Sequence, residues 1–487
     1  MKSLSLGIVR ASASSALAYS RLWSESPTPH RACEGRGNAI IIFYKVTMSK
    51  LKLISLGCSK NTVDSEKIAG LLQLNSWEII PLNSDERSDV SLVNTCGFIA
   101  DARDESIQYI LQAVTQKETG RTGKVFVMGC LAERYRDELQ KEIPEVDGWF
   151  GIAEMDKVIE MIKNEGEERS NIAVPLDEFL QTVTTRAIST YPHSAYLKIS
   201  EGCNRSCSFC AIPLIRGKQR STPIATLVEE ARGLAAKGVK ELIIVAQDVT
   251  AYGLDLYGKR NITELLRALL TIEEIEWFRL QYLYPHGFPE DLLDLMASEN
   301  RICKYIDIPL QHIDTDVLRS MQRATTEDDT LTLLEEVRRK LPDVAIRTTL
   351  IVGYPNETEE AYRKLKSFVE MQQFDRLGVF TYSVEDGTPA FPLGDTVSEE
   401  EKAARASEIM ALQEEISLAK NTSKIGKVLT VLVDKQEGEM YAGRTQYDSL
   451  EVDNTVWIDT TNKLTVGNFY NVKITDAEAY DLYAELV

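Results

Sequence analysis

The stretch that decides the fold is Glu201-Gly202-Cys203-Asn204-Arg205-Ser206-Cys207-Ser208-Phe209-Cys210, which directly follows an apolar run at residues 195–200. A Cys-x3-Cys-x2-Cys spacing on one loop places three thiolates around one small volume. Structural zinc takes four nitrogen or sulfur ligands, and this loop offers no fourth cysteine or histidine. Three thiolates suit an iron–sulfur cluster that keeps one iron without a protein ligand, while zinc stays the alternative.

Short apolar runs alternate with amphipathic stretches after this loop, a pattern typical of α/β structure. Strands are expected at 195–200, 241–246, 277–280, 305–308, 345–352 and 377–382. Helices are expected between them, for example at 225–237, 263–270, 327–340 and 357–371. Six strand-plus-helix units predict a partial (β/α)6 barrel, open if no further strands exist.

An earlier α/β series carries a second group of cysteines. Strands are expected at 51–56, 90–94 and 124–128, and helices at 62–74, 102–114 and 155–163. Cys58, Cys96 and Cys130 each come just past one of these strands, where the ends of parallel strands share a crevice. A glycine beside each cysteine allows backbone to approach a bulky inorganic ligand. The alternative is three separately buried structural cysteines.

The remaining chain divides at two places. After a charged helix at 398–421, residues 424–487 are rich in Val, Thr and Tyr between turn residues, which predicts a small β-barrel. Residues 1–47 are basic and aperiodic, and we interpret them as a disordered leader or as upstream sequence translated ahead of Met48. The expected domains are therefore 48–165, 189–420 and 421–487.

Composition restricts the function. Of 487 residues 44% are hydrophobic and eight are cysteine, too few for a disulfide framework. No apolar stretch approaches the roughly 18 residues of a membrane helix. The formal net charge of −19 disfavours nonspecific binding to phosphate backbones. A basic partner fits better, and the tail repeats this bias with eleven acids against six bases over 421–487.

The cysteine loop, with an aromatic before its last cysteine on the first strand of a six-unit barrel, resembles the radical S-adenosylmethionine superfamily. Together with the flanking domains, residues 50–487 resemble the RimO-type methylthiotransferases. The motifs that carry this likeness are Ser55-Leu-Gly-Cys58-Ser-Lys60-Asn61, Asp64-Ser-Glu66, Asn94-Thr-Cys96-Gly97-Phe98-Ile99, Gly129-Cys130-Leu131, Ile212-Pro213, Arg216-Gly217, Gln247-Asp248, Tyr252-Gly253, Pro309-Leu310-Gln311-His312, Ile351-Val-Gly353-Tyr-Pro355 and Gly443-Arg444-Thr445.

Two positions depart from that pattern. Asn356 replaces a glycine in Pro355-Asn356-Glu357-Thr358, and asparagine tolerates the left-handed backbone that glycine would adopt. Leu450 replaces a proline of the tail, which leaves the local turn there undetermined.

The resemblance implies two [4Fe-4S] clusters, one on Cys58, Cys96 and Cys130 and one on Cys203, Cys207 and Cys210. It implies that S-adenosylmethionine chelates the open iron of the second cluster and that Phe209, Gln247, Gln311 and Gly353 contact this cofactor. The alternative for Gln247 and Gln311 is that their side chains only form hydrogen bonds with the backbone of nearby loops. Cys303 is expected in the core, and His312 and Asp248 are not expected to act as acid–base groups.

The implied activity is methylthiolation of the β-carbon of an aspartate in small-subunit ribosomal protein number twelve, with S-adenosylmethionine as methyl donor and radical source. A flavodoxin- or ferredoxin-type reductant is implied, in the cytoplasm and away from membranes. A tRNA partner is not expected. Two alternatives are a tRNA adenosine methylthiotransferase of MiaB type and a noncatalytic iron–sulfur electron carrier, and cofactor cleavage distinguishes the latter.

Overall fold

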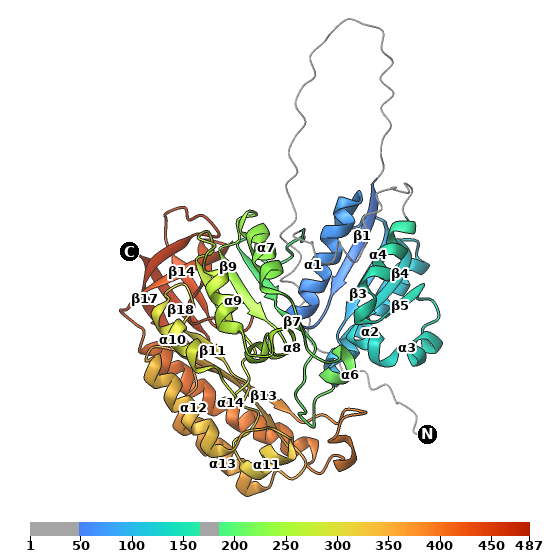
Figure 1. The fold of residues 1–487 in the computed structure, drawn as a ribbon. Coiled ribbons are helices and arrows are strands. Elements are labelled where there is room, and N and C mark those ends of the chain that lie inside the picture. The colour runs from blue at the N-terminus through green and yellow to red at the C-terminus, as the bar shows by residue number, and fades with distance from the viewer. Residues whose placement is uncertain (1–47, 166–184) are drawn as a thin grey trace, which may run out of the picture.

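The computed structural model describes residues 48–165 and 185–487, arranged as an N-terminal domain, a central domain and a C-terminal barrel (Figure 1). The leader expected over residues 1–47 lies outside the described residues. In the view of Figure 1 the blue N-terminal domain and the red C-terminal barrel lie on opposite sides of the central domain.

The N-terminal domain is a parallel five-stranded sheet in the order β2-β1-β3-β4-β5. Its strands are β1 Ser49–Ser55, β2 Trp77–Ile80, β3 Ser88–Thr95, β4 Thr122–Gly129 and β5 Gly148–Phe150. Its helices are α1 Ser59–Leu74, α2 Ala100–Glu118, α3 Cys130–Glu142 and α4 Met155–Asn164. The three expected strands are therefore neighbours at the centre of the sheet, and β2 and β5, which the sequence pattern did not indicate, form its edges.

The central domain confirms the six expected strands. They form two parallel three-stranded sheets, β6-β9-β10 and β11-β12-β13, which an isolated bridge between Phe278 and Ile302 joins. The strands are β6 Ser194–Lys198, β9 Glu241–Val245, β10 Trp277–Leu280, β11 Tyr305–Asp307, β12 Ala345–Val352 and β13 Arg376–Thr381. A short β7–β8 pair, Ser200–Glu201 with Arg220–Ser221, follows β6.

The helices of the central domain are α6 Ile212–Arg216, α7 Ile224–Ala235, α8 Leu254–Tyr257, α9 Ile262–Leu269, α10 Glu290–Ser298, α11 Thr315–Ser320, α12 Glu327–Lys340, α13 Glu359–Gln372 and α14 Glu399–Thr422. Most of them cover the outer face of the partial barrel, whereas α6 packs against α3 of the N-terminal domain (Figure 1). Side chains alternate along a strand, so on β9 Leu242 and Ile244 pack outward into the main core, while Ile243 and Val245 belong to a smaller cluster inside the barrel.

The C-terminal barrel is closed, in the order β14-β15-β16-β18-β17. Its strands are β14 Val428–Glu437, β15 Met440–Thr445, β16 Thr455–Asp459, β17 Phe469–Ala477 and β18 Asp481–Leu486. Val431, Val456, Ile474 and Leu482 are among the buried residues of its own core.

The β15–β16 loop, residues 446–454, reaches into the central domain. Leu450 is 3% exposed and belongs to the cluster inside the barrel, with Val63 of α1 and with Tyr196, Ile243 and Val245. The position where the sequence left the turn undetermined is therefore a hydrophobic contact that joins all three domains.

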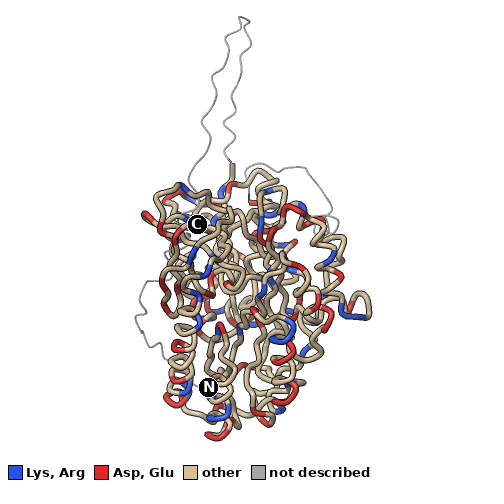
Figure 2. Tube along the Cα trace, turned by 90° about the vertical axis from the view of Figure 1, so that its left-hand side faces the viewer, with Lys and Arg blue, Asp and Glu red and all other residues tan. Residues whose placement is uncertain are grey.

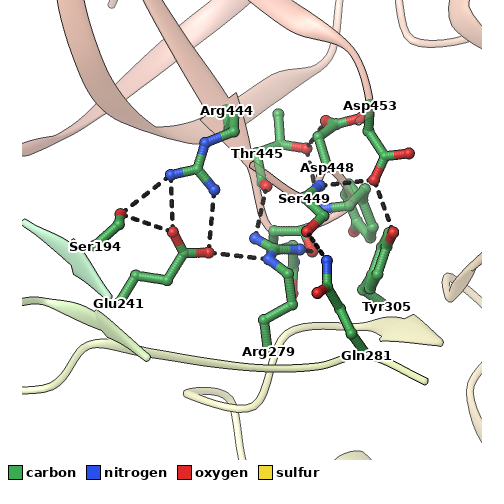
Figure 3. Close-up of polar contacts among 12 residues, drawn as sticks. Ser194, Glu241, Arg279, Gln281, Tyr305, Arg444, Thr445, Asp448, Ser449 and Asp453 are labelled. Carbon is green, nitrogen blue, oxygen red and sulfur yellow. Dashed lines mark hydrogen bonds and ion pairs between the residues drawn. The ribbon is translucent and has the colours of Figure 1, made fainter. Parts of the chain in front are cut away.

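Buried polar groups attach the C-terminal barrel to the strands of the central domain (Figure 3). Arg444 donates to Glu241 at 2.7 Å, and Arg279 donates to the same carboxylate at 2.9 Å. Tyr305 donates to Asp453 at 2.7 Å. Because these groups are buried, the interface is specified by charge pairing as well as by apolar contact.

Acidic and basic residues are interspersed along the chain in the side view (Figure 2). Within the described residues, none of the helices has the length and apolar character needed to cross a membrane.

Candidate functional site

The first cysteine triad lies at the carboxyl ends of three adjacent strands. Cys58 follows β1 and occupies the N-cap position of α1, Cys96 follows β3, and Cys130 follows β4 as the first residue of α3. In the sheet order, β1, β3 and β4 are neighbours. The structure thus brings together the three cysteines that the sequence placed at strand ends.

Glycines allow the three loops to converge. A Cβ added to Gly57 would lie 2.9 Å from the Cys96 sulfur, and one added to Gly97 would lie 2.9 Å from the carbonyl carbon of Cys130. Gly57 has a φ of +89°, a conformation that other residues rarely adopt. These positions accept no larger side chain without moving the cysteines apart.

The pKa values of the three thiols in this triad are not all shifted in the same direction. Burial raises the pKa of Cys130 to about 12, although the nearby Arg216 opposes this effect. Burial also raises the pKa of Cys96. At Cys58 burial acts in the same direction, but the charges of Lys60 and Arg216 outweigh it and lower the pKa. Cys58 is therefore the thiol of this triad that loses its proton most readily to a metal.

The second triad follows β6 and β7 on the loop that begins at Gly202. Burial raises the pKa of Cys203 to about 11 and that of Cys210 to about 12. The Cys207 sulfur lies 3.9 Å from the Tyr284 hydroxyl and 3.8 Å from Nη1 of Arg323. The three thiols interact electrostatically with one another, as expected of one shared site.

Arg216 of α6 links the two triads. Its side chain is 1% exposed, and its Nη2 donates to Asn61 and lies 3.6 Å from the Cys130 sulfur. On the other side Nη1 donates to Glu201 at 2.7 Å, two residues before Cys203. One guanidinium thus contacts a cysteine of the first triad and a carboxylate that lies two residues before the second triad, and Figure 1 shows α6 beside the N-terminal domain.

The donor set fits iron–sulfur clusters. Across residues 48–165 and 185–487, no three His, Cys, Asp or Glu side chains are arranged to hold a single metal ion. A cluster is larger than one ion and takes each thiolate on a different iron, so its ligands are further apart. Each triad supplies three soft thiolates, and the glycines of the first allow its three loops to approach one another closely enough to share one cluster.

The four residues expected to contact the cofactor fall into two groups. Phe209 packs against Ile351 and Tyr354 at the end of β12, Gly353 follows that strand, and Gln311 pairs with Leu350. These residues share one side of the barrel mouth.

Gln247 lies apart from them, after β9. Its Nε2 donates to Glu201 at 2.9 Å, and its Oε1 is buried without a hydrogen-bond partner in the described structure. Gln247 therefore bonds a side chain and not loop backbone, and its carbonyl oxygen stays free to accept a further hydrogen bond.

Gly353 has a structural requirement of its own. Its φ is +74°, and an added Cβ would lie 2.3 Å from Cγ of Lys402. Asn356 has a φ of +79°, which confirms that asparagine adopts the left-handed backbone expected there.

The residues set aside on sequence grounds have structural roles. Burial lowers the pKa of His312 to about 3, so the imidazole stays neutral. Asp248 pairs with Arg205 at 2.7 Å. Cys303 is 1% exposed and belongs to the core, as expected.

Sequence reasoning assigned no role to Lys60, Arg216 or Arg323. Lys60 and Arg216 are part of the motifs quoted for the family, but a positive charge alone does not indicate a catalytic or binding role. The feature that could have singled out Lys60 is its position in the first turn of a helix, where the helix dipole disfavours cations.

Three family models match the chain. The Radical SAM superfamily matches residues 197–369, the uncharacterized protein family UPF0004 matches 50–151, and the TRAM domain matches 425–487. The matches coincide with the central domain, the N-terminal domain and the C-terminal barrel.

Curated relatives are similar over most of the chain. A protein of Christiangramia forsetii is 50% identical over 438 residues, covering 90% of this chain and 94% of its own length. One of Flavobacterium johnsoniae is 49% identical over 439 residues, covering 90% and 98%. Both are named ribosomal protein uS12 methylthiotransferase RimO.

Among solved structures, the radical S-adenosylmethionine methyltransferase TsrM of Kitasatospora setae, with cobalamin and a [4Fe-4S] cluster bound, aligns with a TM-score of 0.53. It is 15% identical, and the alignment covers 71% of this chain and 74% of that one. This likeness shows the fold.

Proposed function

The chain belongs to the family of ribosomal protein uS12 methylthiotransferases named RimO, and from this premise we propose that it attaches a methylthio group to the β-carbon of an aspartate in that ribosomal protein. The observation that carries the proposal is the pair of cysteine triads, each of which lies just past the ends of strands. Arg216 contacts the surroundings of both, so the two sites are near enough to share one substrate.

A radical S-adenosylmethionine enzyme uses an iron–sulfur cluster and S-adenosylmethionine. We assign that cluster to Cys203, Cys207 and Cys210. A second cluster on Cys58, Cys96 and Cys130 accounts for sulfur insertion, which needs a sulfur-bearing site beside the radical source. When bound, these groups supply the radical and the methylthio group.

The chain's own residues position these groups and exclude water. Phe209, Gln311 and Gly353 form one side of the cofactor site, and Gln247 offers its open carbonyl oxygen from the other. Leu450 and its neighbours fill the interior of the barrel with apolar side chains, which limits the access of water to the reacting groups from that side.

The implied partners follow from the chemistry. Radical formation consumes an electron that a flavodoxin- or ferredoxin-type protein supplies. The described cysteines are free, which suits the reducing cytoplasm. The charge of −19 favours a basic ribosomal protein over tRNA, since it repels a phosphate backbone.

The test separates the two triads. Replacing Cys203, Cys207 and Cys210 with Ala is expected to abolish cleavage of S-adenosylmethionine to 5′-deoxyadenosine, because the chelating iron is lost. Replacing Cys58, Cys96 and Cys130 is expected to leave cleavage measurable and to remove sulfur insertion into uS12. Nucleoside analysis and mass spectrometry of anaerobic reactions measure the two outcomes.

Cys303→Ala is the matched control, since it removes a buried core cysteine outside both triads. Methylthiolated uS12 formed by the variant that lacks the first triad would contradict its assignment as the sulfur-bearing site. Modification of tRNA but not of uS12 by the native enzyme would contradict the proposed substrate.

A further inference from the structure

Lys60 is a buried cation for which the described residues offer no carboxylate partner. The residue is 7% exposed, and its Nζ lies 3.3 Å from the centroid of the Tyr282 ring. A buried charge is costly unless it is paired. The aromatic face offsets part of that cost, but it does not provide the hydrogen-bond acceptors that an ammonium group requires.

The neighbouring carboxylates are already engaged by other cations. Asp64 pairs with Lys198 and lies 3.5 Å from Arg216. Glu201 pairs with Lys198 at 2.7 Å and with Arg216 at 2.7 Å. Lys198 and Arg216 thus share both carboxylates, and within the described residues neither carboxylate forms an ion pair with Lys60.

Helix stability does not account for a lysine at this position. Lys60 is in the first turn of α1, and that turn contains no acidic residue. The positive end of the helix dipole repels a cation there. A residue whose charge is unfavourable for the stability of its own helix is expected at a functional site.

The ammonium group is held in place by a fixed platform. Tyr282 follows β10 with a φ of +61°, and its backbone N–H donates to Asp307 at 2.9 Å. Its ring packs against the cluster that contains Val63 and Leu450. Lys60 is therefore presented at the mouth of the barrel, two residues after Cys58, without freedom to reach bulk water.

We propose that Lys60 binds the side-chain carboxylate of the substrate aspartate and thereby selects aspartate over an uncharged residue. This inference rests on the proposed function. The β-carbon is bonded directly to the carboxylate carbon, so a carboxylate held by Lys60 places the reacting carbon beside the first triad. The pairing also gives the ammonium group of Lys60 a carboxylate partner, which the described residues do not provide.

A carboxylate also exists on S-adenosylmethionine, and the structure offers that group a different partner. Arg323 is 8% exposed, has no carboxylate within ion-pair distance in the described chain, and lies 3.8 Å from the Cys207 sulfur. Arg323 therefore lies beside the second triad, where the cofactor is expected. Lys60 lies beside Cys58 of the first triad.

The test compares two peptides of the modified uS12 segment, one with aspartate and one with asparagine at the target position. Their affinities for holoenzyme loaded with S-adenosylmethionine, without reductant, are measured by calorimetry. The native enzyme is expected to prefer the aspartate peptide by about 30-fold or more, as for a desolvated charge pair. Lys60→Met is expected to bring the preference close to one, and Lys60→Arg to retain most of it.

Lys67→Met is the matched control, since it removes another lysine of α1 that pairs with Glu230 at 3.3 Å. It is expected to leave the preference unchanged. An unchanged preference in Lys60→Met overturns the proposal. So does loss of S-adenosylmethionine affinity with the preference intact, or selective loss of iron from the first triad, because either result assigns the lysine to another anion.

The proposed function has its own readout in the same experiment. After reductant is added, the native enzyme is expected to methylthiolate the aspartate peptide. Absence of that product would contradict the proposed function, whereas product formation with no peptide preference would contradict only the role of Lys60.

Discussion

Replacing Glu241 with Gln is expected to loosen the attachment of the C-terminal barrel to the central domain. Glu241 is completely buried at the start of β9 and accepts hydrogen bonds from Arg279, Arg444 and Ser194 (Figure 3). The substitution preserves the shape of the side chain and removes its charge. Two buried arginines then face a neutral amide.

Two estimates of the energetic cost agree. Removing one partner of a buried ion pair costs about 3–5 kcal/mol. Independently, the opposing effects of burial and of the two guanidinium groups leave the pKa of Glu241 lowered from 4.5 to about 2. A tenfold change in an acid constant corresponds to about 1.4 kcal/mol, so the folded state favours the ionised carboxylate by about 3 kcal/mol.

Hydrogen exchange of the C-terminal barrel measures this cost. A decrease of about 3 kcal/mol in the free energy of undocking is expected to accelerate exchange through that opening by about a hundredfold. The control is Glu276→Gln, because Glu276 is half exposed and lies 3.7 Å from Lys240 in a surface pair worth less than about 1 kcal/mol. Exchange rates in Glu241→Gln no faster than in the control would refute the reasoning.

The same network predicts a pH dependence with a definite sign. Because the pKa of Glu241 is lower in the folded state, its contribution is complete above about 4.5 and is lost as the pH falls towards about 2. The difference in exchange between the native protein and Glu241→Gln is therefore expected to narrow over that interval. A difference that widens on acidification would contradict the assignment.

Two further substitutions test contacts between the domains. Leu450→Ala is expected to lower the free energy of unfolding by about 2–5 kcal/mol, since it leaves a cavity inside the barrel; a loss below 1 kcal/mol in denaturant titrations would show that the loop is not packed there. Glu385→Gln is expected to make α2 and α3 more accessible to protease, because Glu385 is buried and pairs with Arg103 and with Arg134 at 2.8 Å; a cleavage pattern identical to that of native protein would contradict this role.

The positions of the main strands, and of the cysteines just past their ends, could be predicted because both depend on local sequence. Apolar runs of strand length indicate buried parallel strands, and residues just past their ends meet at one edge. Cys58, Cys96 and Cys130 follow that rule. The short edge strands β2 and β5 did not stand out, because four and three residues are too few to establish a period.

The charged residues between the domains could not be assigned from sequence in the same way. Nothing in the sequence distinguishes Arg216 and Glu201 from other charged residues. Their structural role follows from the contacts that Arg216 makes with Glu201 and with Asn61 and Cys130, which are far from it in the sequence. Pairings of this kind require the tertiary fold. Lys60 is the exception, since its conflict with the helix dipole is visible once the start of α1 is placed.

The acidic tail shows why counting charges misleads when burial is unknown. The side chains of Asp434, Asp448 and Asp453 are each 7% exposed or less and are bonded within the interface. Replacing any of them is expected to weaken the docking of the barrel, so such variants would not report on substrate capture alone. Under the proposed function, attraction of a basic ribosomal protein would depend instead on acids at the surface, and Asp459 of β16 is one that the structure exposes. Because surface charge acts mainly on encounter, its reversal is expected to slow association in a salt-dependent way while the interface stays intact.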